Sequence, residues 1–374
     1  MTTRATGPIR ILGGARSGIA IIACALAGAT ASACGNSTSP SPASSSAPSV
    51  SATPTAGSTA PTAPISSLTT STPAPATGTW SDADSIDPGL DLLAVSCPST
   101  TDCVAVDGTS GTSTPSGNAL TYNGTSWSAP QAIDAPNTIV GVSCPTTSFC
   151  AAVDSSGDAL TYNGSSWTPF TGVDSVGQFE AVSCVSASFC VAVDNSGDAY
   201  TFNGTAWSSP VQVDSTQGIL TAVSCPTTSF CAGVGGTGAF TFNGTTWSPP
   251  EALGAGENTG TGPPDGVSCP SSSFCVAVGS EGGVFTYNGS SWSTKADVDE
   301  VGGVSGGLAA VSCASASFCM AVDEDSNRSV TFDGSSWSAP TTLSSGYGLA
   351  AVSCPSSSFC AAVDGNADAF TWKS

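Results

Sequence analysis

Short runs of alternating apolar and polar residues recur along the chain beyond residue 77, separated by Gly, Asn, Asp, Ser and Pro. Alternation with a period of two is typical of β-strands with one buried face. The runs follow a fixed order: V-S-C, then F-C-x-A-V followed by Asp or Gly, then A-x-T-x-N-G. The last run is a Trp with Ser or Thr two positions before it and directly after it. This pattern predicts four strands per repeat and an all-β fold.

The repeat occurs seven times, and its leading cysteines are 40 to 47 residues apart. A unit of this length with four predicted strands matches one blade of a β-propeller. We therefore predict a seven-bladed β-propeller over residues 78–374. The leading cysteines are Cys97, Cys144, Cys184, Cys225, Cys269, Cys313 and Cys354.

The two ends of the repeat region complement each other. The last unit ends at Trp372-Lys373-Ser374, where its fourth strand should begin, whereas Gly78-Thr79-Trp80-Ser81, with Ser85-Ile86-Asp87 after it, resembles an isolated fourth strand. Pairing these segments would complete the last blade and remove an open sheet edge. We expect a ring closed by this N-terminal strand rather than a linear solenoid, which would need a cap at each end.

Every unit contains two cysteines six positions apart, which places one on each arm of the first hairpin. Cross-strand neighbours lie within disulfide range, so one disulfide per blade is the economical interpretation. Zinc is the alternative, although the spacing is not that of common zinc ligands. The expected pairs are Cys97-Cys103, Cys144-Cys150, Cys184-Cys190, Cys225-Cys231, Cys269-Cys275, Cys313-Cys319 and Cys354-Cys360.

The third and fourth strands are predicted to form a hairpin through Asn-Gly, as in Tyr122-Asn123-Gly124. Asn-Gly favours a type I′ turn, in which both central residues have positive φ. Five of these turns also match the N-glycosylation sequon, but their repetition favours turn chemistry. The single tryptophan of each repeat is interpreted as packing between blades, with sugar stacking as the alternative.

Composition removes several functions. The chain has 27 acidic and 6 basic residues, a formal charge of −21 and no histidine. This charge repels phosphate backbones, so nucleic acid is excluded as a partner. Without histidine there is no Ser-His or Cys-His dyad and no imidazole metal ligand. Carboxylates, tyrosines and thiols remain for chemistry.

The N-terminus predicts export. Three arginines, Arg4, Arg10 and Arg16, precede an apolar run over residues 19–33 that is too short to span a bilayer, as in a signal peptide. Ala31-Ser32-Ala33-Cys34 resembles the lipobox of bacterial lipoproteins, in which the cysteine carries the lipid, although such motifs usually have Leu where Ala31 stands. The same residues form an A-x-A cleavage site, so free secretion is the alternative.

Cysteine parity favours lipidation of Cys34 over free secretion. Cys24 is removed with the signal peptide over residues 1–33 and the other cysteines form pairs, so that only Cys34 is left. Residues 34–77 are rich in Ser, Thr, Pro and Ala, carry no charge and predict a disordered tether. We therefore expect a lipoprotein on the outer face of the cell membrane, or a secreted protein.

The turn sequence T-Y-N-G-x-x-W-S resembles the Asp-box of sialidases and related propellers, with Asn in place of Asp in five copies and Asp333 as the exception. The resemblance implies a hairpin between strands three and four. Sialidases use an arginine triad, and Arg328 is the one arginine beyond the signal peptide, so that activity is excluded. Residues 78–374 also resemble exported V-S-C-P repeat proteins of actinobacteria, which implies class and location only.

If the N-terminal strand is outermost, the disulfide hairpins and Asn-Gly turns share one face, and the connections between strands two and three and between blades share the other. The second face varies in length and charge, and loops on a rigid scaffold often carry function. Asp134, Asp174 and Asp214 lie in the loops between blades. The ligand-binding candidates are Asp107, Asp154, Asp158, Asp194, Asp198, Asp323, Asp325, Asp364 and Asp368.

These carboxylates have three possible interpretations. In the first, they start turns by accepting backbone hydrogen bonds. In the second, they bind a cation: Asp323, Asp325 and Asn327 have D-x-D-x-N spacing, although Arg328 replaces the expected glycine. In the third, two of them act as acid and nucleophile on a glycoside. We assign no catalytic residue, and we expect no cofactor, with calcium as the one candidate.

These patterns predict a binding or scaffold module at the cell envelope rather than an enzyme. Its partner would be a glycan or an envelope protein, its only membrane attachment would be the lipid anchor, and we expect a monomer. The alternatives are a carboxylate-dependent glycoside hydrolase of the Asp-box propeller type and a structural envelope protein without a discrete ligand.

Overall fold

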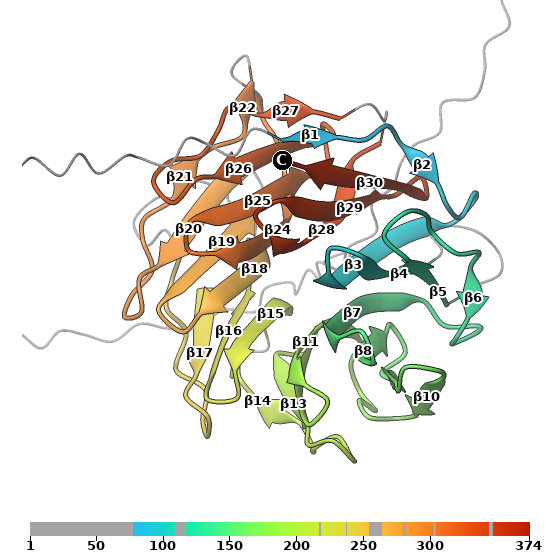
Figure 1. Cartoon of the computed structure of the whole chain (residues 1–374). Coiled ribbons are helices and arrows are strands. Elements are labelled where there is room, and N and C mark those ends of the chain that lie inside the picture. The colour runs from blue at the N-terminus through green and yellow to red at the C-terminus, as the bar shows by residue number, and fades with distance from the viewer. Residues whose placement is uncertain are drawn as a thin grey trace, which may run out of the picture. The chain divides into compact units, whose positions relative to one another are not determined.

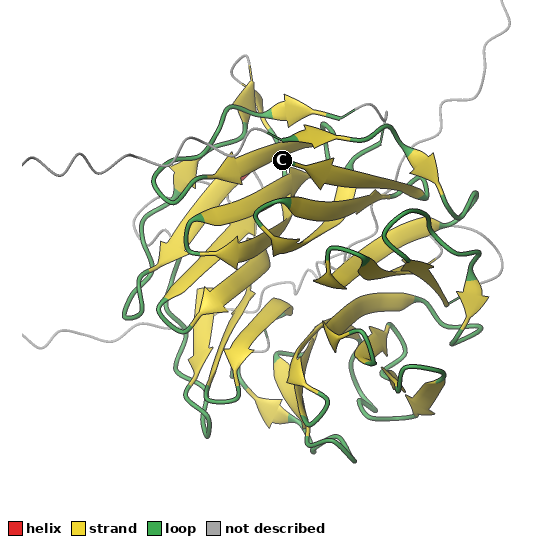
Figure 2. Cartoon of the chain, viewed as in Figure 1, coloured by secondary structure: helices red, strands yellow, loops and turns green. Residues whose placement is uncertain are grey.

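The computed structural model describes residues 78–108, 117–216, 218–236, 238–253, 264–279, 282–301, 304–343 and 347–374. The predicted signal peptide, Cys34 and the tether lie outside these residues. The described part contains strands and turns but no α-helix (Figure 2). It therefore includes no helix that is long and apolar enough to cross a membrane.

The strands form seven antiparallel blades around a ring, as the sequence predicts (Figure 1). We number the blades 1 to 7 by their first strands. These are β3 (Asp91–Ser99), β7 (Ile139–Thr146), β11 (Phe179–Ser186), β15 (Leu220–Thr227), β18 (Pro264–Ser271), β24 (Leu308–Ser315) and β28 (Leu349–Ser356). Each first strand contacts the first strands of both neighbouring blades, and β28 contacts β3, so the cycle is complete.

The second and third strands continue each blade outward. The second strands are β4 (Asp102–Gly108), β8 (Phe149–Asp154), β12 (Phe189–Asp194), β16 (Phe230–Gly235), β19 (Phe274–Gly279), β25 (Phe318–Asp323) and β29 (Phe359–Asp364). The third strands are β5 (Asn118–Tyr122), β9 (Ala159–Tyr162), β13 (Asp198–Phe202), β17 (Gly238–Phe242), β20 (Gly283–Tyr287), β26 (Arg328–Phe332) and β30 (Asp368–Lys373).

The outer strands of blades 1, 2, 3, 5 and 6 are β6 (Gln131–Ala132), β10 (Trp167–Phe170), β14 (Val211–Gln212), β21 (Ala296–Asp297) and β27 (Thr341–Thr342). In most blades a bridge at the tryptophan, such as Tyr122 to Trp127, precedes the short strand. Blade 4 has only bridges, from Phe242 to Trp247 and from Ala239 to Glu251. A small hairpin of β22 (Glu300–Val301) and β23 (Val304–Ser305) lies between blades 5 and 6 in the chain.

The N-terminal segment closes the ring. Strands β1 (Thr79–Trp80) and β2 (Asp84–Ser85) both pair antiparallel with β30, with Trp80 opposite Trp372. The indole nitrogen of Trp80 donates a 2.9 Å hydrogen bond to the Ser329 hydroxyl of blade 6. The predicted exchange of the outer strand is confirmed, because the first and last strands of the described chain belong to one blade.

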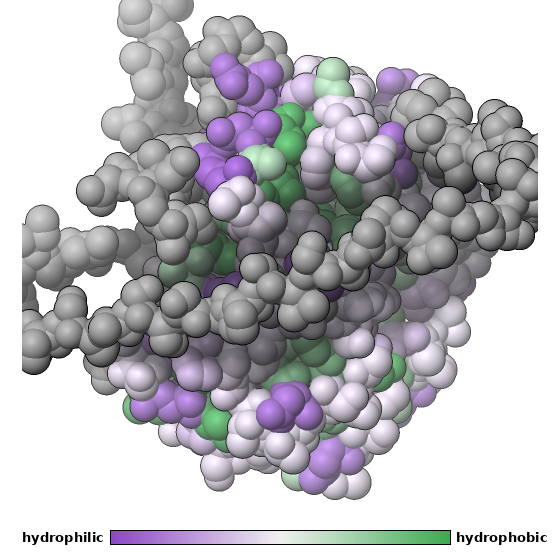
Figure 3. Space-filling model, turned by 90° about the vertical axis from the view of Figure 1, so that its left-hand side faces the viewer, coloured by the Kyte–Doolittle hydropathy of each residue, from purple (hydrophilic) through white to green (hydrophobic). Residues whose placement is uncertain are grey.

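The core lies between blades rather than under a single sheet. Each hydrophobic cluster combines residues of two neighbouring blades; in one, Leu120 and Tyr122 of blade 1 pack with Phe359 and Val363 of blade 7. The outward surface is consequently polar, and the face in Figure 3 shows small apolar areas separated by polar ones.

The tryptophans are part of these clusters. Trp127 is half-buried, with its ring centroid 5.3 Å from that of Tyr122, which in turn lies 6.1 Å from Phe359 of blade 7. The same order of rings joins Trp207 and Phe202 of blade 3 to Phe149 of blade 2. Packing between blades therefore accounts for one tryptophan per repeat.

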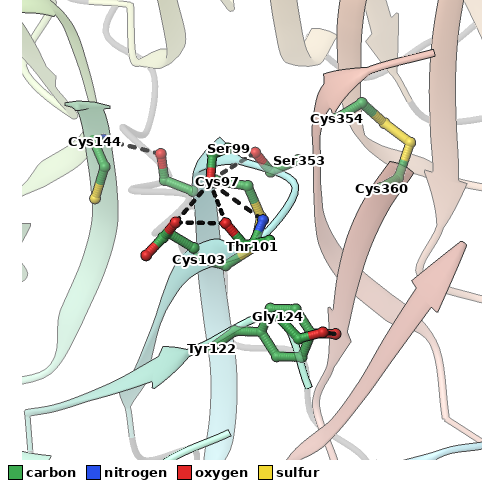
Figure 4. The surroundings of a disulfide bond; sticks show 12 residues. Cys97, Ser99, Thr101, Cys103, Tyr122, Gly124, Cys144, Ser353, Cys354 and Cys360 are labelled. Atoms are coloured by element: carbon green, nitrogen blue, oxygen red, sulfur yellow. Dashed lines mark hydrogen bonds between the residues drawn. A yellow bond between two sulfur atoms is a disulfide. The ribbon is translucent and has the colours of Figure 1, made fainter. Parts of the chain in front are cut away.

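All seven expected disulfides are present, with Cα–Cα distances of 3.9 to 4.1 Å. Figure 4 shows the surroundings of the Cys97–Cys103 disulfide. Each joins the first and second strands of one blade. Cys97 and Cys103 also belong to the cluster shared with blade 7. Seven disulfides indicate an oxidising environment for the folded protein.

A ring of serine hydrogen bonds also links the blades. The register between first and second strands shifts at or just after the leading cysteine. In blade 2 the backbone N–H of Cys144 donates to the hydroxyl of Ser96 in blade 1 at 2.9 Å, and Cys97 donates to Ser353 of blade 7 (Figure 4). The other five blades repeat this bond at the same length. The serine of V-S-C is therefore an inter-blade acceptor.

The Asn-Gly turns differ from the predicted type I′ geometry. In blade 1 the bridge from Tyr122 to Trp127 encloses four residues, and of these Gly124 alone has positive φ, at 90°. The Asn123 side-chain oxygen accepts bonds from the N–H groups of Thr125 and Ser126 and from the Thr125 hydroxyl. These side-chain bonds hold the turn with a single positive φ, at Gly124, and they explain why a Ser or Thr follows the Asn by two residues, as in a sequon.

Candidate functional site

The connections lie on two opposite faces of the propeller. In blade 3 a Cβ on Gly204 would lie 3.2 Å from Ser188, so the Asn-Gly turn packs against the disulfide hairpin. At the other end of the strands, the Asp174 N–H donates to the carbonyl of Gly157, which joins the second-to-third turn of blade 2 to the loop leaving that blade. We call these the disulfide face and the variable face.

Most of the candidate carboxylates on the variable face are buried. Five of them lie at the end of a second strand, or one residue before it in blade 1, and are 0% exposed: Asp107, Asp154, Asp194, Asp323 and Asp364. Asp368 is also buried, Asp158 and Asp198 are half-buried, and Asp325 is exposed. A large ligand can therefore reach only some of the nine, and their binding role stays a prediction.

The buried carboxylates fix turns. One oxygen of Asp154 accepts the backbone N–H groups of Ser156 and Asp158, at 2.9 and 2.7 Å. Asp194 and Asp364 form equivalent bonds within their own turns. The turn-forming interpretation of these residues is thus confirmed.

The D-x-D-x-N segment forms an ion pair with its own arginine. Asp323 accepts backbone N–H groups from Asp325 and Ser326, and its other oxygen accepts from Arg328 Nε and Nη2 at 3.0 and 2.9 Å. Arg328 thus supplies the positive charge at the segment that the sequence suggested as a cation-binding site. Among the described residues, no group of three or more Cys, Asp or Glu side chains could hold a metal ion.

The structure also brings carboxyl groups together in pairs. Asp87, in the loop leaving blade 7, contacts Asp107 of blade 1, and Asp134, leaving blade 1, contacts Asp154 of blade 2. One oxygen each of Asp87, Asp134 and Asp154 is buried without a donor. These pairs connect neighbouring blades at the variable face.

Two further pairs have a different bridging group. In blade 3 the Tyr200 hydroxyl donates to Asp194 at 3.4 Å and also interacts with Asp174. In blade 6, Arg328 Nε lies 3.1 Å from Asp299 while the same guanidinium binds Asp323. In both pairs another side chain supplies the hydrogen bond or the charge.

Burial raises the pKa of the loop aspartate in each of the first two pairs. It raises the pKa of Asp87 to about 7, and the hydrogen bond and negative charge of Asp107 add to the shift. Burial together with Asp154 likewise raises the pKa of Asp134 to about 7. Desolvation penalises the ionised form, and a neighbouring carboxylate penalises it further.

In the other two pairs, different groups oppose the shift. Burial and then Asp323 raise the pKa of Asp299 to about 7, and the Arg328 charge lowers it. Burial raises the pKa of Asp194 to about 6, against the lowering effect of its backbone hydrogen bonds. Strongly shifted groups often mark functional sites, but structural networks shift pKa values as well.

The Asp134·Asp154 pair does not have the geometry of a glycosidase. The two carboxyl groups of a retaining enzyme are about 5 Å apart, and those of an inverting enzyme are further apart, to admit the glycosidic bond or a water. The side chains of Asp134 and Asp154 are in contact, and Asp154 is 0% exposed. This pair leaves no room for a sugar between its carboxyl groups.

Sequence reasoning placed Asp134 and Asp174 in the loops between blades but did not pair them, and it did not single out Asp87 or Asp299. A signal was available: Asp87, Asp134 and Asp174 each precede the aspartate that ends the next second strand by 20 residues. This recurring interval aligns the loop carboxyl with the strand carboxyl. The burial of both groups, however, depends on the neighbouring blade.

The variable face also presents exposed apolar groups. Val176 is 84% exposed and Tyr347 is 46% exposed, and both lie in loops between blades. Exposed acidic residues in the connection between blades 5 and 6 include Asp297, the last residue of β21, and Glu300, the first residue of β22. Apolar side chains among acidic ones are typical of surfaces that contact a partner.

An open depression of about 500 Å³ lies at the outer rim between blades 2 and 3. Phe170 of β10 lines one side, and residues 205–210 of blade 3, including Trp207, line the other. Its walls are mixed polar and apolar, and no chemistry-bearing side chain points to a reaction there.

Comparison with known proteins gives the fold. No protein-family model and no curated protein sequence matches the chain. Among solved structures, it is similar to YCF48 bound to D1 peptide, with 12% identity, a TM-score of 0.61 and coverage of 79% of this chain and 95% of that one.

YCF48 from Cyanidioschyzon merolae gives 14% identity and a TM-score of 0.59, covering 79% of this chain and 98% of that chain. A chain of the Mitotic Checkpoint Complex gives 12% identity, a TM-score of 0.58 and coverage of 79% and 91%. At these identities the likeness establishes the propeller fold alone.

Proposed function

We propose that this protein is an exported binding or scaffold module of the cell envelope whose variable face binds a basic protein or peptide. One observation carries the proposal: the repeats keep the disulfide face uniform, whereas the variable face combines acidic residues with the exposed Val176 and Tyr347. Uniform turns serve the fold, so differences between repeats are free to serve a partner.

Charge favours a basic partner. The chain carries a formal charge of −21, which attracts cationic groups over a distance and repels acidic polymers. Propellers of this fold are compatible with peptide binding, since one similar structure is that of YCF48 bound to D1 peptide. A glycan remains the alternative ligand, and its binding would depend less on ionic strength.

The experiment is a binding screen of the protein against immobilised basic peptides, acidic peptides and cell-wall glycans, at low and high salt. We expect saturable binding to basic peptides that weakens with salt. A variant with Val176→Ser and Tyr347→Ser should lose binding, whereas Ser188→Ala on the disulfide face should retain it. Salt-independent glycan binding would contradict the proposal, and so would binding that both variants retain. If no probe binds, the structural-protein alternative is favoured.

We also propose that Cys34 carries the lipid anchor. The seven disulfides use fourteen of the sixteen cysteines, and Cys24 lies in the predicted signal peptide. The mature N-terminal peptide should therefore show the mass of a diacylglyceryl cysteine, and Cys34→Ser should move the protein from the membrane fraction to the medium. An unmodified Cys34 peptide would support free secretion instead.

A further inference from the structure

The four inter-blade carboxyl pairs show different solutions to one electrostatic problem. Each pair places two acidic groups where the strand carboxylate is 0% exposed. Two buried negative charges in contact are strongly unfavourable unless a positive charge or a proton compensates one of them. Arg328 compensates in blade 6, and the Tyr200 hydroxyl lies at the pair in blade 3.

The same strand position carries Arg328 in blade 6 and Asn118 in blade 1. Each is the first residue of its third strand, and each pairs with the last residue of its short outer strand, Thr342 or Ala132. Asn118 donates from its side chain to Asp107 at 2.6 Å, as Arg328 donates to Asp323. Asn118, however, is neutral. Unlike Arg328, it therefore does not compensate the second negative charge of the Asp87·Asp107 pair.

Blade 2 has still less compensation. The third-strand neighbour there is Asp158, which adds negative charge, and Asn137 is the polar side chain that faces the pair. One oxygen of Asp134 and one of Asp154 are buried without a donor. A buried acceptor without a donor is costly, and a proton on one carboxyl would satisfy both oxygens in a single hydrogen bond.

We propose that the pairs Asp87·Asp107 and Asp134·Asp154 each hold one shared proton and act as proton-dependent links between neighbouring blades. A protonated pair carries one negative charge, and so does Asp299 and Asp323 together with Arg328. In blade 6 the Arg328 charge lowers the pKa of Asp299, although burial and Asp323 still raise it to about 7.

A metal ion is a poorer occupant. Calcium takes six to eight oxygen ligands. One oxygen of Asp154 is already engaged by two backbone N–H groups, and both oxygens of Asp107 accept from Asn118. Too few oxygens remain to surround such an ion.

The sign of the pH effect follows from the direction of the shifts. The pKa values of Asp87 and Asp134 are raised from the ordinary 3.8 to about 7 in the folded protein. The stabilisation is therefore complete below the unfolded value and is lost as pH rises through about 7. The propeller should melt at a higher temperature at mildly acidic pH than at mildly alkaline pH.

The test compares melting temperatures at pH ~5 and ~8, on either side of the raised pKa values. Asp134→Asn, which mimics the protonated acid, should raise the melting temperature by several degrees at the higher pH and change it little at the lower pH. The control is Asp82→Asn, which removes the same charge from an exposed residue. Identical melting of the two variants at both values would overturn the proposal.

Exchange of the compensating residues gives a second test. Asn118→Arg should flatten the pH dependence, and Arg328→Asn should steepen it. Carboxyl ¹³C NMR of the unaltered protein reads the protons directly and needs no variant to fold; we expect Asp87 and Asp134 to be among the aspartates that titrate near neutrality. Titration of all aspartates in the ordinary acidic range would overturn the proposal. A melting temperature that calcium raises at pH ~8, and that Asp134→Asn makes insensitive to calcium, would assign the pair to a cation instead.

Discussion

The hydroxyl of Ser353, in the last blade, accepts a 2.9 Å hydrogen bond from the backbone N–H of Cys97, in the first. The two residues are 256 positions apart, yet the bond has the same length as the six that join consecutive blades. The junction between the first and last blades is therefore built like every other junction in the ring.

Removing one of these serines should destabilise the propeller. Ser353→Ala leaves the Cys97 N–H without its acceptor, and an unsatisfied buried donor costs about 1–3 kcal/mol. Ser143→Ala, at an ordinary junction, should cost a similar amount, whereas Ser188→Ala in an exposed turn should cost little. Denaturant unfolding measures all three. A much smaller cost at Ser353 than at Ser143 would show that the closing junction is weaker than the others.

Each disulfide should contribute modestly and independently. The double substitution Cys144→Ala and Cys150→Ala opens a loop of six-residue separation, for which the loop-entropy estimate is about 2 kcal/mol. Mass spectrometry should find no free thiol among the fourteen paired cysteines. Stoichiometric zinc in the purified protein would contradict the disulfide assignment.

Substitution of Trp80 should lower the unfolding free energy more than substitution of an ordinary outer-strand residue. Its indole packs with the blade 6–blade 7 cluster and donates to Ser329. Trp80→Ala should lower the unfolding free energy by about 2 kcal/mol or more, through lost burial and an unpaired Ser329 hydroxyl. Trp80→Phe retains the ring packing and should recover part of the loss. Equal stability of both variants and the unaltered protein would mean that the N-terminal strand around Trp80 does not close the ring.

Arg328 should be more important at alkaline than at acidic pH. Arg328→Leu leaves Asp299 and Asp323 facing each other without their cation, and breaking a buried ion pair costs about 3–5 kcal/mol. Part of this cost should disappear at acidic pH, where one carboxyl takes up a proton. Thermal melts across pH measure the difference, and a loss of stability that is constant with pH would contradict the assignment.

The sequence was sufficient to predict the architecture because its signals are local and repeated. Trp80 near one end and Trp372 near the other indicated the shared blade, and cysteines six apart indicated the hairpin disulfides. The turn at Asn123 was predicted with the wrong backbone geometry, because the hydrogen bonds of its side chain compete with the type I′ preference. Local propensity could not weigh those bonds.

The contacts between blades were much harder to predict. Ser96 reads as an ordinary small polar residue in a strand until Cys144 of the next blade is placed beside it. Asp154 reads as an exposed turn residue, but Asp134 and the neighbouring blade cover it completely. Burial of this kind arises from the closed ring, so no single repeat reveals it.

Hydrogen exchange of the backbone amides of Ser81, Ile86 and Thr371 tests ring closure most directly. The N–H of Ser81 donates to the carbonyl of Thr371 at 2.8 Å, and that of Ile86 donates to the carbonyl of Ala367 at 2.9 Å. Closure predicts that these amides exchange as slowly as that of Ser128, which makes the equivalent bond in blade 1. Exchange of Ser81 and Ile86 at the rate of an unstructured chain, while Ser128 stays protected, would contradict the closed ring.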